Sequence, residues 1–148
     1  MRLTKRIKEG QELIQKGSSH SLEDAISNVA KFPKVKFIFA HYGGVLPLVK
    51  ERFDTTYNML RKRNFVKDIQ KNPSDYFKNL YFDTSGSKSV ASLLCALELT
   101  DAAHILFGSD FPANQNLQLS IQVLQEMALS EEQKRFILGD NALNLLQL

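Results

Sequence analysis

The stretch FIFAHYGGVLP at residues 37–47 decides the fold of this sequence. Its apolar residues run directly into His41, and Gly43 and Gly44 follow at once. An apolar run that does not alternate with polar residues is typical of a parallel strand covered on both faces. We therefore predict a strand over residues 36–40. The glycines predict a tight turn that leaves the imidazole at the end of that strand.

Two further segments have the same form, LYFDTS at residues 80–85 and HILFGSD at residues 104–110. Apolar periodicity, capping residues and the prolines predict helices between and around the three strands. Their expected ranges are 3–15, 21–32, 48–63, 73–77, 89–99, 117–128, 131–138 and 141–146, with Gly139 separating the last two. Alternating strands and helices predict an α/β fold of right-handed βαβ units around a parallel sheet.

Composition places the chain among ordinary globular proteins. It has 148 residues, of which 43% are apolar and 24% charged, so we expect a single domain over residues 1–148 with a basic helical segment at 1–17. No apolar run approaches the ~20 residues needed to cross a bilayer, and one cysteine cannot form an internal disulfide, so we expect a cytoplasmic protein without a membrane partner.

The charge of the chain does not indicate a nucleic-acid partner. Its formal net charge is +3, but the basic residues are spread along the sequence, with small clusters at residues 2–8 and 61–63. No aromatic residues interleave with these clusters in a stacking pattern. Solvated helix faces are therefore the favoured interpretation, and no nucleic-acid binding is expected.

Each predicted strand ends in polar residues that could carry chemistry, namely His41, Asp83 and Asp110. The carboxyl ends of parallel strands meet at one rim, where ligands bind in α/β folds. Structural roles compete with this interpretation for all three residues. His41 could be a core or capping histidine, Asp83 could cap the following turn, and Asp110 could form an Asx-turn before Phe111-Pro112.

Four segments together resemble a known family. They are FPKVKFIFAHYGGVLPLVKER at residues 32–52, NPSDYFKNLYFDTSG at 72–86, ILFGSDFP at 105–112 and ILGDNALNLL at 137–146. In this order and at these spacings they resemble the C-terminal part of the amidohydrolase-related proteins, which include aminocarboxymuconate-semialdehyde decarboxylase and the resorcylate-type decarboxylases. The resemblance covers roughly residues 18–148.

The resemblance implies a partial TIM barrel, in which the three strands are the sixth to eighth of a metal-dependent (β/α)8 barrel. It also implies site residues. Asp110 would bind the metal and handle the proton of metal-bound water, and His41 would orient that water as acid and base. Arg52 would hold a substrate carboxylate, although without the resemblance it would be expected to pair with a neighbouring acid on its helix. Asp83 is left out of the catalytic set.

The chain departs from the family at its metal ligands. Family members carry His-x-His on the first strand and a further histidine after the fifth, and neither is present here. The only histidines are His20, His41 and His104, and His104 lies at the opposite end of its strand, roughly 20 Å from Asp110. Because a catalytic zinc site usually has three protein ligands, we expect zinc or manganese to bind this chain weakly or not at all when it is alone.

Several functions remain open from the sequence. The first is metal-dependent decarboxylation, a carbon–carbon lyase reaction, or hydrolysis of a small carboxylate-bearing substrate, by the C-terminal portion of such an enzyme together with an N-terminal barrel half. The second is a non-catalytic remnant or an oligomeric binding module without a complete metal site. A third is an interaction module that uses the basic N-terminal helix.

Three strands leave both sheet edges open, so Phe37, Phe39, Ile105 and Phe107 would lack cover.

Overall fold

The computed structural model describes residues 22–65 and 69–147. The helix expected over residues 3–15, the basic segment at 1–17 and His20 therefore lie outside the described residues. The elements, in chain order, are α2 (Leu22–Lys31), β1 (Ile38–Phe39), η1 (His41–Gly43), α3 (Leu46–Arg61), α4 (Pro73–Phe77), β2 (Tyr81–Asp83), α5 (Val90–Leu97), η2 (Ala102–His104), β3 (Ile105–Leu106), α6 (Leu117–Glu126), α7 (Glu131–Arg135), η3 (Phe136–Asp140) and α8 (Asn141–Leu146).

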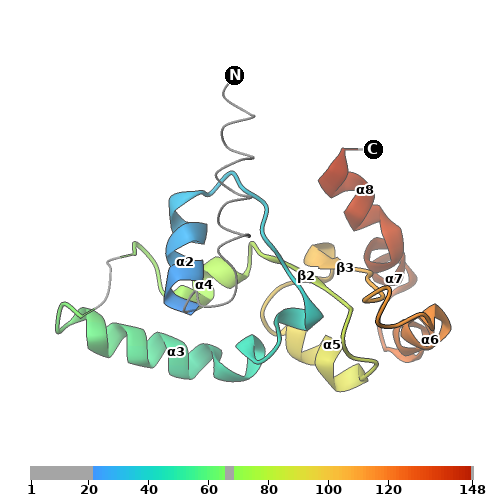
Figure 1. Cartoon of the computed structure of the whole chain (residues 1–148), viewed down its shortest axis with the longest axis horizontal. Coiled ribbons are helices and arrows are strands. Elements are labelled where there is room, and N and C mark those ends of the chain that lie inside the picture. Colours follow the sequence, from blue (N-terminus) through green and yellow to red (C-terminus); the bar gives the residue numbers. More distant parts are fainter. Residues whose placement is uncertain (1–21, 66–68, 148) are drawn as a thin grey trace.

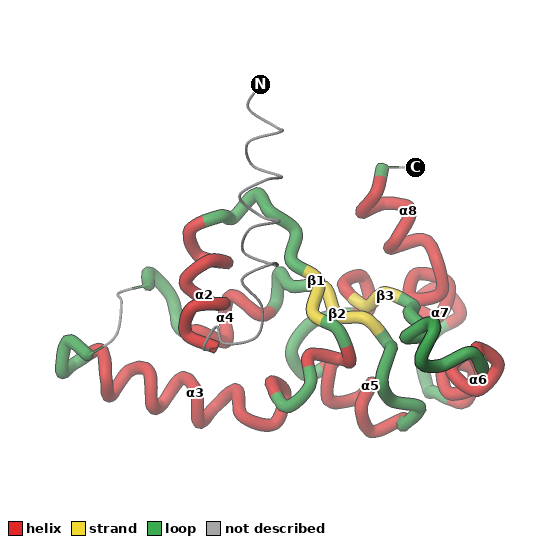
Figure 2. Tube along the Cα trace, viewed as in Figure 1, coloured by secondary structure: helices red, strands yellow, loops and turns green. Residues whose placement is uncertain are grey.

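Three short parallel strands form the centre of the fold, with the helices arranged around them (Figures 1 and 2). Their order is β1-β2-β3, and Ile38 pairs with Tyr81 while Phe82 pairs with Ile105. The predicted α/β class and parallel sheet are confirmed. Each strand is shorter than the sequence predicted, because regular pairing covers only the residues at the middle of the sheet.

The core packs against the central strand. Phe82 is fully buried, and its ring centroid lies 6.0 Å from that of Phe39. Ile105, Leu93 and Ile137 are also buried in the same apolar cluster. The expectation that Ile105 lacks cover is therefore wrong, because the C-terminal helices pack over it, whereas Phe37, Phe39 and Phe107 are only partly buried.

The outer edge of β3 is closed, so the expectation of two open edges is also wrong. The carbonyl of Leu106 accepts a hydrogen bond from the amide of Thr84 inside the sheet. Because the backbone groups of successive residues face opposite sides of a strand, those of Ile105 and Phe107 face the outer edge. The carbonyl of Ile137 accepts the Phe107 amide at 3.0 Å. The side-chain amide of Asn141 donates to the carbonyls of Ala102 and Ile105, each at 2.7 Å. The backbone amide and carbonyl groups on the outer edge of β3 are thus hydrogen-bonded to the C-terminal helices rather than to another strand.

Several helix boundaries follow the sequence signals, and one does not. Pro47 lies in the first turn of α3, and the hydroxyl of Ser89 accepts from the amide of Ala91 to cap α5. Gly139 does not separate two helices as predicted. The backbone widens there into the π turn η3 and continues directly into α8, while Ile137 and Asn141 stay bonded to β3.

Within the described residues, no helix combines the length and the apolar character required to span a membrane.

Candidate active site at the carboxyl ends of the strands

The three strand ends meet at one rim of the sheet. His41 lies one residue beyond the end of β1, Asp83 is the last residue of β2, and Asp110 lies in the segment that follows β3. Nε2 of His41 lies 3.6 Å from Oδ1 of Asp110, although the two residues are far apart in sequence. The side chains are 54% and 40% exposed, so both reach solvent and remain accessible to a ligand. The structure brings together the pair that the sequence singled out, whereas their catalytic roles stay predictions.

His41 is held in a backbone conformation that few residues adopt. Its φ is 58°, and Tyr42 beside it has a φ of 56°. Left-handed backbone costs a non-glycine residue about 1–2 kcal/mol. The turn continues through Gly43 and Gly44, which also have positive φ and adopt it without that cost. The glycines therefore allow the chain to turn sharply away and leave the imidazole at the rim.

Asp83 holds this turn in place. Its Oδ1 atom accepts the backbone amide of His41 at 2.8 Å and that of Ser85 at 3.0 Å, and it also accepts the hydroxyl of Ser85. The sequence allowed for a capping role, and the bond to Ser85 is such a cap. The bond to His41 was not predicted. An acid at the end of the middle strand, between two neighbours with polar ends, was the signal that could have indicated it.

Asp110 does not form the Asx-turn that the sequence allowed for. Its carboxylate accepts no backbone amide from the described residues, and the hydroxyl of Ser109 bonds the amide of Phe111 instead, at 3.2 Å. The backbone of Asp110 has a φ of 65°. The neighbouring serine therefore stabilises the turn, and the carboxylate of Asp110 remains directed to His41.

Tyr42 and Thr84 are the buried residues that directly follow His41 and Asp83 in the chain. Burial raises the pKa of Tyr42 to about 12, the charge of Asp83 adds to that rise, and a hydrogen bond with Thr84 opposes it. Thr84 also bonds both the carbonyl and the amide of Gly108, at 3.2 and 3.1 Å. Tyr42 therefore keeps its proton at neutral pH and acts here as a packed structural group.

Gly86 lies directly under the imidazole of His41. A Cβ atom at this position would stand 2.6 Å from Cγ of His41, and the φ of Gly86 is +73°. Gly44 offers a matched comparison, because its φ is +61° but a Cβ atom there would meet nothing within 4 Å. The positive φ favours glycine at both positions. Only at Gly86 would a side chain also collide with the imidazole of His41.

We expect Gly86→Ala to displace His41 from Asp110, whereas Gly44→Ala should leave the pair in place. Both variants place an alanine at a positive φ that its Cβ atom disfavours, so both melting temperatures should fall. The imidazole carbon and proton shifts of His41 in NMR spectra should change only in Gly86→Ala. Equal shifts of His41 in the two variants would show that the imidazole is not held against Gly86.

Arg52 lies in α3 and is exposed. It makes no ion pair or hydrogen bond with His41, with Asp110, or with any acid among the described residues. The expectation that it pairs with a neighbouring acid in the absence of another role is therefore not met. Its guanidinium is left available to a ligand.

The described residues do not form a complete metal site. No group of three or more histidine, cysteine or acidic side chains lies together in residues 22–65 and 69–147. At the rim, the donor set is the carboxylate of Asp110 and the imidazole of His41, which is fewer than the three protein ligands of a catalytic zinc site. These two groups alone do not fit a catalytic metal ion.

Comparisons with known proteins agree with this architecture. An amidohydrolase family model matches residues 13–148. The chain is 31% identical over 124 residues to a gamma-resorcylate decarboxylase of Polaromonas, covering 80% of this chain and 36% of that protein. It is 29% identical to a 6-methylsalicylic acid decarboxylase of Penicillium expansum, covering 77% and 35%. The chain thus spans about a third of the length of these relatives.

Solved structures show the same partial correspondence. A 5-carboxyvanillate decarboxylase from Sphingomonas paucimobilis superposes with a TM-score of 0.75 at 22% identity, over 84% of this chain and 39% of that one. A dihydroxybenzoic acid decarboxylase from Polaromonas, crystallised with manganese and 2-nitroresorcinol, superposes with a TM-score of 0.68 at 25% identity, over 86% and 39%. The three-stranded sheet with its helices is therefore part of a TIM barrel, and the chain belongs to the amidohydrolase family.

Proposed function

We propose that this chain supplies the acid–base pair and the carboxylate clamp of a metal-dependent decarboxylase acting on a small aromatic carboxylate. The observation that carries the proposal is the 3.6 Å approach of His41 to Asp110 at the carboxyl ends of the strands. The names of the similar proteins support the reaction and the substrate class, and the manganese in one of them supports a divalent metal.

Decarboxylation requires one proton to be delivered to carbon. The bond between the ring carbon and the carboxylate breaks, carbon dioxide leaves, and a proton takes its place on that carbon. A histidine beside a carboxylate can hold such a proton at Nε2 and release it, and general acid catalysis of this kind contributes about 10²–10⁴-fold. In this proposal, His41 and Asp110 hold the proton, and Asp110 is also the ligand that the chain contributes to the metal.

Arg52 is the proposed carboxylate clamp. A guanidinium binds a carboxylate through two parallel hydrogen bonds, which fixes the plane of the substrate. Arg52 is exposed and has no acidic partner in the described part of the chain, so no existing ion pair has to break before a substrate binds. Arg52→Lys should therefore weaken substrate binding more than it slows the chemical step, because a lysine cannot form the two parallel bonds.

The remaining metal ligands have to come from outside the described residues, because two donors do not complete the site. We propose a second barrel portion as their source, since the relatives are about three times as long as the segment matched here. A non-catalytic remnant or an oligomeric binding module is the second candidate, and the incomplete donor set favours it. Hydrolysis of a carboxylate-bearing substrate at the same pair is the related alternative.

Joining the missing barrel portion to this chain tests the proposal. In a chimera, this chain replaces the matching C-terminal third of the Polaromonas gamma-resorcylate decarboxylase, and carbon dioxide release from 2,6-dihydroxybenzoate is measured with Mn²⁺ present. We expect release from the chimera and none from the 148-residue chain alone. A chimera that folds, retains manganese and releases no carbon dioxide would favour the non-catalytic remnant. Hydrolysis of ester or amide analogues by that chimera would favour the hydrolase.

A further inference from the structure

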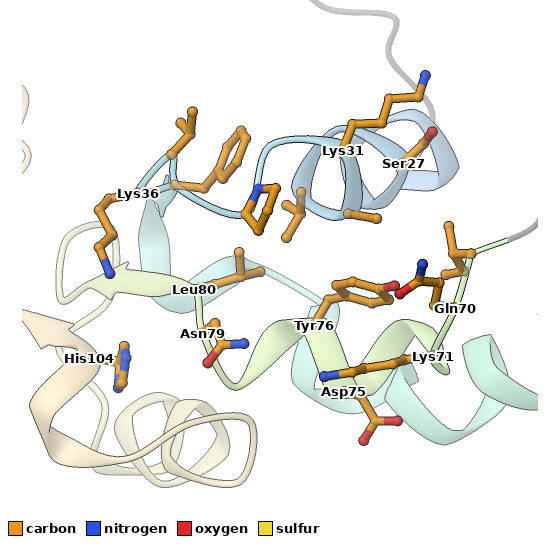
Figure 3. Close-up of a pocket in the computed structure, with 16 residues that line it drawn as sticks. Ser27, Lys31, Lys36, Gln70, Lys71, Asp75, Tyr76, Asn79, Leu80 and His104 are labelled. Atoms are coloured by element: carbon orange, nitrogen blue, oxygen red, sulfur yellow. The ribbon is translucent and has the colours of Figure 1, made fainter.

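A pocket of about 1010 Å³ lies between α2, the loop that leads into β1, and α4. We propose that it binds a small anion with a flat apolar body, an aromatic carboxylate or phosphate monoester of about two rings. Its volume is at the upper end of the range of small-molecule pockets, about 300–1,000 Å³. Figure 3 shows the pocket lined from above by α2 and the following loop and from below by α4 and the start of β2.

This pocket is separate from the rim that carries His41 and Asp110. Its lining residues Phe37, Leu80 and His104 immediately precede β1, β2 and β3, whereas His41 and Asp110 follow their strands. Since the strands are parallel, the two sets lie at opposite ends of the sheet. A ligand in the pocket therefore cannot be a substrate bound at the strand-end pair.

One end of the pocket is suited to an anionic head group. The amine of Lys36 lies 5.9 Å from the ring centroid of Tyr81, and the imidazole of His104 lies 4.9 Å from the same centroid. In Figure 3 the Lys36 amine points toward the side of the pocket where His104 lies, with Asn79 beside them. Lys36 pairs with no carboxylate in the described part of the chain, so its charge is not neutralised there.

His104 is oriented by a carboxylate on its other side. Its Nδ1 atom lies 2.7 Å from Oδ1 of Asp101, which also accepts the backbone amide of Ala103. A carboxylate at Nδ1 fixes the ring orientation and leaves Nε2 for a ligand. Its side chain is 26% exposed, so the ring is held by its surroundings and still reaches solvent. The Lys36 amine and the Asn79 side-chain amide offer hydrogen-bond donors from two separate segments, and Nε2 of His104 adds a third when the imidazole is protonated.

The rest of the pocket is suited to an apolar body. Val29, Ile69 and Leu80 are buried lining residues that give it an apolar wall. The ring of Tyr76 lies between the two walls in Figure 3 and offers a flat surface for stacking. The acid in the lining, Asp75, already has a positive neighbour, since its Oδ1 lies 3.9 Å from the amine of Lys78. The positive charge of the pocket lysines therefore favours an anion.

Titration with 2-naphthoate, followed by NMR of the whole chain, tests this proposal. We expect saturable binding that shifts the signals of His104, Asn79 and Leu80. The neutral isostere 2-naphthamide should bind at least about tenfold more weakly, because the charge-assisted bond to Lys36 is lost. 2-Naphthyl phosphate tests a phosphate head on the same body, and the tighter of the two anions identifies the preferred head group. Inorganic phosphate alone should bind at least about tenfold more weakly than either.

Two matched variants locate the head group. Lys36→Met keeps an unbranched side chain against Tyr81 and removes the charge, so 2-naphthoate affinity should fall by about tenfold or more. Lys34→Met removes an exposed charge from the same loop outside the pocket lining and should leave the affinity unchanged. Both lysines are exposed, so the melting temperature should hold in each variant.

Three results would overturn the proposal. They are equal affinity for 2-naphthoate and 2-naphthamide, unchanged affinity in Lys36→Met, and shifts centred on His41 and Asp110 in place of His104. The last would mean that aromatic anions bind only at the strand-end pair. None of these results bears on carbon dioxide release by the completed barrel, so the two proposals fail separately.

Discussion

Asp110→Asn in the completed barrel is expected to lower the turnover number for decarboxylation by about 10²–10⁴-fold, the range attributed to a positioned acid or base. Asparagine keeps the size of the side chain but removes the negative charge and the ability to accept a proton. It would leave His41 without the carboxylate that lies 3.6 Å from its Nε2 atom. The carboxylate of Asp110 is proposed both to bind the metal and to handle the proton. Manganese affinity should therefore fall in the same variant.

The loss in Asp110→Asn should not come from unfolding. The Asp110 side chain is 40% exposed and accepts no hydrogen bond from the described residues, so the melting temperature should change little. Glu132→Gln is the matched control, since it makes the same change from carboxylate to amide on the exposed surface of α7. An active, manganese-loaded Asp110→Asn enzyme would remove this residue from the mechanism.

Phe82→Ala is expected to destabilise the chain by about 3–5 kcal/mol, the usual cost of truncating a buried phenylalanine. Phe82 is fully buried on the central strand, its ring packs 6.0 Å from that of Phe39, and a Cβ atom on Gly43 would stand 2.7 Å from it. Since domains of this size are stable by only about 5–15 kcal/mol, this one change should remove a large part of the total. Urea unfolding followed by circular dichroism measures it.

Phe65→Ala is the matched control for Phe82→Ala. Phe65 is 72% exposed, so its truncation should change the free energy of unfolding by no more than about 0.5 kcal/mol. Phe82→Leu, which keeps most of the buried volume, should fall between the two. Similar costs for the two alanine variants would mean that Phe82 is not at the centre of the core. The turn after β1 should also loosen in Phe82→Ala, because Gly43 packs on the missing ring.

The sequence predicted the part of the fold that follows from local signals. Apolar runs located the three strands, Pro47 and Ser89 marked helix starts, and the parallel order followed from the alternation of elements. The pairing of His41 with Asp110 was predictable because parallel strands end at one rim. None of these inferences required knowledge of a contact between distant side chains.

The features that the sequence missed depend on such distant contacts. The closed edge of β3 comes from Asn141 and Ile137, and no local pattern marks either residue as a partner of that strand. Gly139 was predicted to end a helix. The hydrogen bonds of its neighbours Ile137 and Asn141 to β3 instead keep the helix continuous through a π turn. The bond from the His41 amide to Asp83 has the same origin, because the two residues meet only after β1 pairs with β2.

The central claim is that His41 and Asp110 form one half of a metal-dependent site at the carboxyl ends of the strands. Titration of the chain with Mn²⁺, followed by paramagnetic broadening of NMR signals, tests it most directly. The account predicts weak binding, without a stoichiometric ion retained after dialysis, and broadening centred on His41, Asp83 and Asp110 while His104 stays sharp. Broadening centred at His104, or spread evenly over the chain, would contradict it.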